Sequence, residues 1–174
     1  MKPTNEQIDW VVAYLQKHNL GMRGVFDGDC DRQFYGLLAE IMVKDLLKQP
    51  RPDMDFSAPN PFGDGGFDFI YNSKKVDVKC ERRNVTFKPH FVHNLVGNQI
   101  WYKTDYYLFC SWNVPRYSLK ICGIISKGDF AQLARFYKKG ESRKRDDGTE
   151  FFLQADLYEI DDKCLTKNWR DVLR

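Results

Sequence analysis

The spacing of apolar residues predicts where the helices lie. Hydrophobic positions recur every three or four residues, the pattern of a helix with one buried face, in three stretches: 5–18, 31–48 and 127–138. Asp31 is placed to cap the second helix, and Pro50 and Pro52 follow its end. We therefore predict these three amphipathic helices, together with short helical turns in the tail of the chain.

Apolar runs and alternating patterns predict the strands. Five stretches carry one of these patterns: 67–71, 75–81, 106–112, 118–126 and 150–160. Asn72 and Ser73 suit a tight turn, so the first two strands are expected to form a hairpin. Residues 84–104 are expected to be extended, with a short helix near 94–102, and residues 139–149 to form a charged loop.

This order of elements favours the α/β (α+β) fold class, with a mixed central β-sheet flanked by α-helices. The length of 174 residues fits one domain, 1–174, and the predicted elements place its core at about 33–160.

The composition and the N-terminal sequence argue against several classes of protein. No apolar run reaches the ~20 residues of a membrane span. The five cysteines are odd in number and form no C-x-x-C pair, which disfavours a disulfide framework and a cysteine-rich zinc site. The N-terminal sequence does not resemble a signal peptide, so a cytoplasmic protein without a membrane partner is expected. The net charge of +3 is too small to indicate nucleic-acid binding by itself.

Charged residues in the predicted hairpin suggest a chemical site. In the segment VDVKC (76–80), alternation along a strand places Asp77 and Lys79 on one face and the apolar residues on the other. Asp68, on the preceding strand, follows the same logic. Burying carboxylates without partners is costly, and a hard divalent cation such as Mg²⁺ removes that cost by binding oxygen ligands.

The predicted cation would have ligands from both strands of the hairpin. Asp68 and Asp77 would supply carboxylates, and Val78 its main-chain carbonyl. Lys79 would lie beside a metal-bound water, where it could orient or deprotonate that water or stabilise charge on a phosphate. Glu40, on the second predicted helix, could reach the same cation or hold another one.

This arrangement resembles the PD-(D/E)XK phosphodiesterase (restriction-endonuclease-like) superfamily. The resemblance rests on Glu40 in a helix, Asp68 in a strand and the triplet Asp77-Val78-Lys79 in the next strand. It implies a restriction-endonuclease-like core and Mg²⁺-dependent hydrolysis of nucleic-acid phosphodiesters, with Mn²⁺ as a substitute in vitro. It also implies that the two aspartates bind the metal with help from Glu40, and that Lys79 serves the attacking water.

The chain departs from the family pattern at two points, and other candidates remain open. Phe67 stands where the family has proline, and the second acid is aspartate rather than glutamate. Asp64 is a rival for the first acid, and DDK (161–163) is a second acid-x-Lys triplet. His90 and His93 form H-x-x-H without further zinc ligands, so a surface or packing role is expected for them.

Basic residues near the hairpin favour nucleic acid as the partner, with DNA preferred over RNA. The candidate phosphate contacts are Lys74, Lys75, Arg82, Arg83 and Lys88. A second basic cluster is weaker, because acids lie among its members: Lys138, Lys139, Arg143, Lys144 and Arg145. A homodimer or a larger complex is left open.

Polar and aromatic residues after the hairpin complete the candidates. Gln99 could contact the substrate or Lys79, whereas aromatic residues that follow it are expected in the core: Tyr102, Tyr106, Tyr107 and Trp112. Two other functions stay open. One is a noncatalytic nucleic-acid-binding or assembly module on the same fold, and the other is a protein-interaction module whose charged strand face is solvated.

Overall fold

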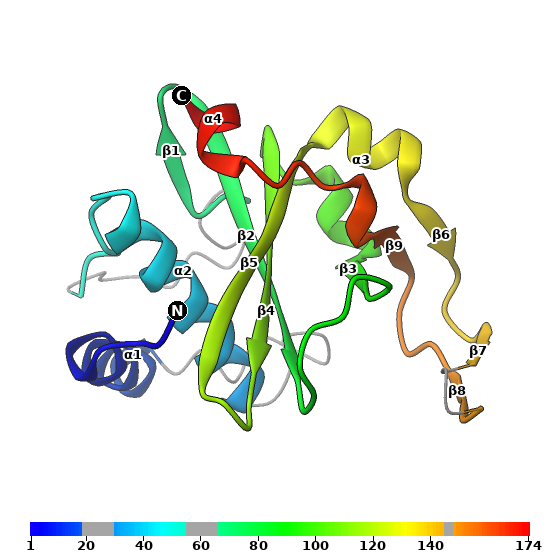
Figure 1. Cartoon of the computed structure of the whole chain (residues 1–174), viewed down its shortest axis with the longest axis horizontal. Coiled ribbons are helices and arrows are strands. Elements are labelled where there is room, and N and C mark those ends of the chain that lie inside the picture. Colours follow the sequence, from blue (N-terminus) through cyan, green and yellow to red (C-terminus); the bar gives the residue numbers. More distant parts are fainter. Residues whose placement is uncertain (19–29, 55–65, 145–147) are drawn as a thin grey trace.

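A mixed sheet of four strands forms the centre of the protein (Figure 1). The computed structural model describes residues 1–18, 30–54, 66–144 and 148–174. The strands are β1 (Phe69–Tyr71), β2 (Lys74–Arg83), β4 (Tyr106–Asn113) and β5 (Ser118–Ser126), in the order β1-β2-β4-β5. The β2–β4 pair is parallel, and the β1–β2 and β4–β5 pairs are antiparallel.

The predicted hairpin is confirmed, including its turn. Asn72 and Ser73 connect β1 to β2 and have positive φ angles of 48° and 65°. Two consecutive residues with positive φ match the right-handed twist of the flanking strands, and this is the backbone that favours asparagine at the first position. The register pairs Phe69 with Val76 and Tyr71 with Lys74.

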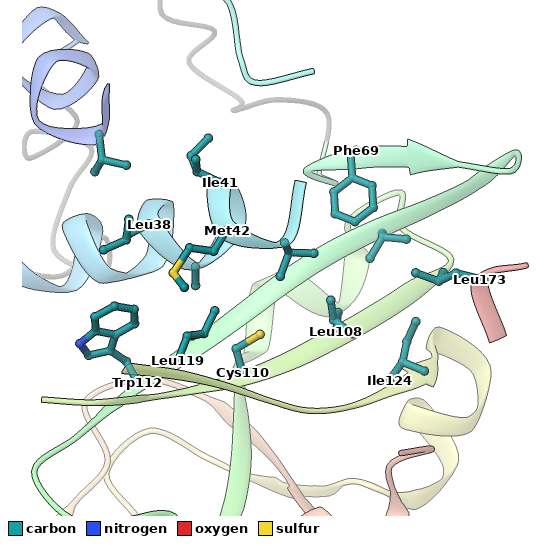
Figure 2. Close-up of a cluster of buried hydrophobic side chains, with 14 residues drawn as sticks. Leu38, Ile41, Met42, Phe69, Leu108, Cys110, Trp112, Leu119, Ile124 and Leu173 are labelled. Carbon is teal, nitrogen blue, oxygen red and sulfur yellow. The ribbon is translucent and has the colours of Figure 1, made fainter. Parts of the chain in front are cut away.

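Two helices cover one face of the central sheet, α1 (Asn5–His18) and α2 (Cys30–Leu46). The sequence predicted both helices, but Asp31 lies inside the first turn of α2 rather than at its cap. Figure 2 shows the apolar cluster between the helices and the sheet, whose labelled members include Leu38, Ile41, Phe69, Leu108 and Trp112. Val11 and Leu173 also belong to this cluster, although they lie outside the predicted core of 33–160.

A smaller antiparallel sheet covers the opposite face of the central sheet. Its order is β3-β9-β6, with β3 (Val92–Val96), β9 (Leu157–Asp161) and β6 (Arg135–Tyr137). It packs together with α3 (Lys127–Leu133), as Figure 1 shows. A second apolar cluster fills this side: Leu95, Ile100, Tyr107, Phe109, Cys122, Ile125, Phe130, Ile160 and Leu165. The central sheet is therefore buried on both faces, with helices on one side and mainly strands on the other.

Three predicted elements have different bounds. The helix predicted at 127–138 ends at Leu133, because the backbone becomes extended at Ala134 and continues as β6. The strand predicted at 150–160 is interrupted, and its first part, β8 (Glu150–Phe152), pairs with β7 (Ser142–Lys144) inside the predicted charged loop. The helix expected near 94–102 is the short 3-10 helix η2 (Gly97–Trp101).

The chain ends with η3 (Asp162–Cys164) and α4 (Trp169–Leu173), which agree with the predicted helical turns. Within the described segments, every helix is too short or too polar to cross a membrane. The protein is thus an α+β protein with a mixed central sheet, and the coarse prediction of its fold class is confirmed.

Candidate active site

Alternation along β2 directs Asp77 and Lys79 to the face of the central sheet opposite α2. Their register partners on β4 are Tyr107 and Phe109, which belong to the apolar cluster on that side. Val78, between the two charged residues, packs against the cluster beneath α2. The predicted separation of charged and apolar residues in this strand is confirmed.

Asp68 is fastened to β2 by its main chain and by its side chain. Its backbone N–H donates to the carbonyl of Val76 at 2.9 Å, and its Oδ2 accepts the backbone N–H of Val78 at 2.6 Å. The β1–β2 pairing ends at Phe69, and the bond of Asp68 to Val78 places its carboxylate beside the segment of β2 that carries Asp77 and Lys79. The structure therefore brings the two predicted aspartates together across the hairpin.

Lys79 forms an ion pair with Asp77. Its Nζ lies 2.8 Å from Oδ2 of Asp77, and the exposed fractions of the side chains are 18% for Lys79 and 5% for Asp77. Burial alone would lower the pKa of Lys79, but Asp77 and Asp68 raise it, and the net effect is a raised pKa. The lysine is therefore an ammonium group, largely shielded from water, beside two carboxylates.

The main-chain carbonyl of Val78 points to the same edge of β2 as Asp68. The N–H and C=O of a strand residue share one edge, and the N–H of Val78 bonds to Asp68. This edge lies beyond Phe69, the first residue of β1 in the ladder. Two carboxylates and one carbonyl thus gather within a short stretch of the hairpin. Their oxygen chemistry suits a hard cation such as Mg²⁺.

Glu40 lies on α2 and is engaged by a neighbour on the same helix. Its Oε1 accepts a hydrogen bond from Lys44 Nζ at 2.6 Å, and both side chains are largely buried. The four-residue spacing of this pair is that of adjacent residues on one helical face. The contacts described for Glu40 therefore place it beside Lys44. Lys44 is missing from the sequence prediction, although the E-x-x-x-K spacing of the pair is visible in the sequence.

Arg83 has a different role from the one predicted. Its guanidinium forms an ion pair with Glu81 and donates to the carbonyl of Val92 at 2.7 Å, and it lies over the ring of Phe91. Burial raises the pKa of Glu81 to about 7, although Arg83 and the N–H of Asn94 oppose the shift. These contacts join β2 to β3, so Arg83 links two layers of the fold, a role that the sequence did not predict.

The other predicted phosphate contacts differ in how accessible they are. Lys74 Nζ donates to the carbonyl of Val172 at 2.6 Å, which ties it to the C-terminal helix. Arg82 pairs with Asp31 at 3.2 Å on the surface, and Lys88 is exposed. Lys75 Nζ lies 5.3 Å from the ring centre of Phe67. Asp64 and Arg145 lie outside the described residues.

Asp162 belongs to the second acid-x-Lys triplet and His93 to the histidine pair, and the two lie together in a second buried cluster. His93 is buried, and its Nε2 lies 3.0 Å from Asp162, whereas His90 is exposed. Ligand atoms of His93, Cys122 and Asp162 lie within 4.8 Å of one another. Lys167 Nζ lies 2.6 Å from Asp162. Burial raises the pKa of Cys122 to about 12. We interpret this cluster as a packing network.

The second acid-x-Lys triplet does not form a site like that of the hairpin. Asp161 pairs with Arg135 at 2.7 Å, and Lys163 is exposed. Of the aromatic residues expected in the core, Tyr107 and Trp112 are fully buried, whereas Tyr102 is exposed. Tyr102 instead lies near the hairpin, with its ring centre 6.0 Å from Lys79 Nζ.

Comparison of the chain with protein-family models, curated proteins and solved structures gave no match.

Proposed function

We propose that this protein is a Mg²⁺-dependent phosphodiesterase of the PD-(D/E)XK type, and that it acts as a DNA endonuclease. One observation carries the proposal. The carboxylate of Asp68 accepts the N–H of Val78, the residue between Asp77 and Lys79, and Lys79 Nζ lies 2.8 Å from Asp77. Two carboxylates and a lysine at this spacing are the set that the family resemblance implies. The mixed central sheet with α2 on one face is compatible with a restriction-endonuclease-like core, which is part of the proposal.

The carboxylates of Asp68 and Asp77 and the carbonyl of Val78 would hold the cation. When bound, Mg²⁺ would polarise the phosphate and promote ionisation of a water molecule. Asp68 now accepts the N–H of Val78 through Oδ2, which fixes the orientation of its carboxylate. Because the site lies in a strand pair backed by two apolar clusters, little rearrangement of the main chain is needed for binding.

Lys79 would act as a cation toward the substrate. Its ammonium neutralises Asp77 in the free protein, and a bound cation would take over part of that role. Lys79 could then donate to the attacking water or to a phosphate oxygen, where negative charge develops in the transition state. Attack of water on phosphorus would break the P–O3′ bond, transfer a proton to the leaving oxygen and leave a 5′-phosphate.

Glu40 would support the site from α2. Its carboxylate is paired with Lys44, and α2 lies on the face of the sheet opposite Asp77, so we propose that Glu40 assists cation binding through water. For the phosphate backbone we retain Lys75, Arg82 and Lys88 as contacts, with Lys74 and Arg83 restricted by their bonds inside the fold. We further propose that the protein works in the cytoplasm, because all five cysteines are unpaired. A homodimer or larger complex stays part of the proposal.

The proposal is tested by incubating the protein with supercoiled, linear, single-stranded and branched DNA and with RNA, in Mg²⁺, Mn²⁺ or EDTA. We expect metal-dependent cleavage by the wild-type chain and its loss in Lys79→Met. Lys163→Met is the matched control, since Lys163 belongs to the other acid-x-Lys triplet and is 80% exposed. Equal cleavage by Lys79→Met would contradict the proposal. Binding of DNA without cleavage would favour the noncatalytic nucleic-acid-binding module.

A further inference from the structure

Trp101 is an exposed tryptophan close to the proposed site. It is the last residue of η2, and 82% of its surface is accessible to solvent. Tryptophan is usually highly buried, because its large ring gains much from leaving water. Trp112, in the central sheet, follows that rule and is fully buried. A bare indole on the surface is therefore a feature that a binding partner would explain.

Tyr102, the residue after Trp101, packs the end of η2 against the segment that leads into the hairpin. A Cβ atom on Gly66 would lie 2.6 Å from Cβ of Tyr102, so only glycine allows this approach, two residues before Asp68. The ring centre of Tyr102 lies 6.0 Å from Lys79 Nζ. The carbonyl of Tyr102 accepts a hydrogen bond from Lys127 Nζ at 2.6 Å. Trp101 is thus held next to the edge of the proposed site.

The surroundings of Trp101 are rich in positive charge. Three lysines lie in or against the segments that meet here, Lys75, Lys103 and Lys127, with one carboxylate, Asp105, among them; Lys79 is also near but is paired with Asp77. Lys103 is exposed, and Lys75 contacts residues 104–105 through its main chain. An exposed aromatic ring among cations is the combination by which proteins bind single-stranded nucleic acid. The cations hold the backbone, and the ring stacks on a base.

We propose that Trp101 is a stacking platform for an unpaired base of the nucleic-acid substrate. A base inside a duplex is already stacked on both faces, so it would have to leave the helix to reach the indole. A base in a single strand, a branch or a frayed end has a free face. The platform would therefore select substrates with unpaired bases beside the cleaved phosphate. This inference rests on the proposed nuclease function and names its substrate class.

The test compares binding of three ligands in EDTA at fixed salt: a short oligothymidylate, an oligomer of the same length made of abasic nucleotides, and a duplex. Trp101→Ala is expected to weaken binding of the oligothymidylate roughly 5- to 150-fold and to leave the abasic oligomer and duplex unaffected. Trp101→Phe should recover part of the loss. Phe152→Ala, in β8, is the matched control, because Phe152 is also an exposed aromatic residue.

Several results would overturn the platform. They are unchanged binding of oligothymidylate by Trp101→Ala, an equal loss for the abasic oligomer, absence of oligothymidylate binding by the wild-type chain, or dissociation of a dimer caused by the substitution. The nuclease function and the platform are contradicted by different results. Base-dependent binding without cleavage by the wild-type protein would support the platform and contradict the nuclease. Cleavage without base-dependent binding would support the nuclease and contradict the platform.

Discussion

At the scale of single residues, the pair of Asp77 and Lys79 dominates the electrostatics of the hairpin. Removing one member of a buried ion pair is costly, because the other charge stays behind in a place with little water. The same reasoning makes a cation a natural replacement for Lys79. The side chain of Asp77 is 5% exposed, so it needs a positive neighbour both with and without a bound cation.

We predict that Lys79→Met lowers the free energy of unfolding by about 3 kcal/mol and that Mg²⁺ restores part of this loss. A divalent cation bound to Asp77 and Asp68 would neutralise the buried negative charge of Asp77, which has lost its ion-pair partner in this variant. Urea unfolding with and without millimolar Mg²⁺ measures the effect. If Mg²⁺ does not stabilise Lys79→Met, or stabilises Asp77→Asn equally, the two aspartates do not form the cation site.

Glu81 gives a prediction about pH. Its pKa rises from 4.5 to about 7, first because it is buried, so the folded protein holds this proton more tightly than the unfolded chain. The stability that Glu81 contributes is therefore present in acid and is lost as the pH rises from 4.5 to about 7. Glu81→Gln, which can still accept the N–H of Asn94, removes this dependence.

Urea unfolding of wild type and Glu81→Gln across this pH range checks the sign. The stability of Glu81→Gln relative to wild type should rise with pH by on the order of 3 kcal/mol. A relative stability that is constant or falls with pH would show that Glu81 is ionised in the fold throughout.

At the scale of elements, the part of the site that the sequence could predict lies within one hairpin. Strand alternation and turn residues are local properties, and they sufficed to group Asp68, Asp77 and Lys79. The contact of Arg83 with Val92 could not be predicted, because it forms only through packing of β2 on β3, whereas its other partner, Glu81, lies two residues earlier on the same strand. The end of α3 was missed for a similar reason, since β6 forms by pairing with the distant strand β9.

The hairpin turn supplies a prediction at this scale. Ser73 has a φ angle of 65°, a conformation that costs a residue with a Cβ more than it costs glycine. We predict that Ser73→Gly stabilises the protein by roughly 0.5–1 kcal/mol, because Asn-Gly is the preferred pair in this kind of turn. Thermal unfolding measures the change. Ser142→Gly in β7 is the control and should not stabilise; equal effects would show that the turn is not strained.

At the scale of the whole molecule, the C-terminal helix holds the turn of the hairpin. Asn72 Nδ2 donates to the carbonyl of Leu173 at 3.1 Å, and Lys74 Nζ donates to the carbonyl of Val172 at 2.6 Å. The side chain of Leu173 is fully buried in the cluster beneath α1 and α2. Residues about a hundred positions apart in sequence thus hold β1 and β2 in place.

We therefore expect Leu173→Ala to destabilise the protein by about 2–5 kcal/mol and to weaken catalysis although Leu173 is not part of the site. Leu133→Ala, at an exposed leucine, is the control. Urea unfolding and the cleavage rate are measured on both variants below the temperature at which either unfolds. Full cleavage activity in a destabilised Leu173→Ala would show that α4 does not organise the hairpin.

If the hairpin holds the divalent cation, the position of the bound cation can be mapped by cleavage of the main chain. Fe²⁺ can be bound in place of Mg²⁺, and ascorbate with peroxide then cuts the main chain next to the metal. The fragments are identified by mass spectrometry, with excess Mg²⁺ as competitor. We predict cuts near Asp68 and within residues 77–79, suppressed by Mg²⁺ and absent in Asp77→Asn. Cuts near His93, Cys122 and Asp162, or no cuts that Mg²⁺ suppresses, would contradict a cation site in the hairpin.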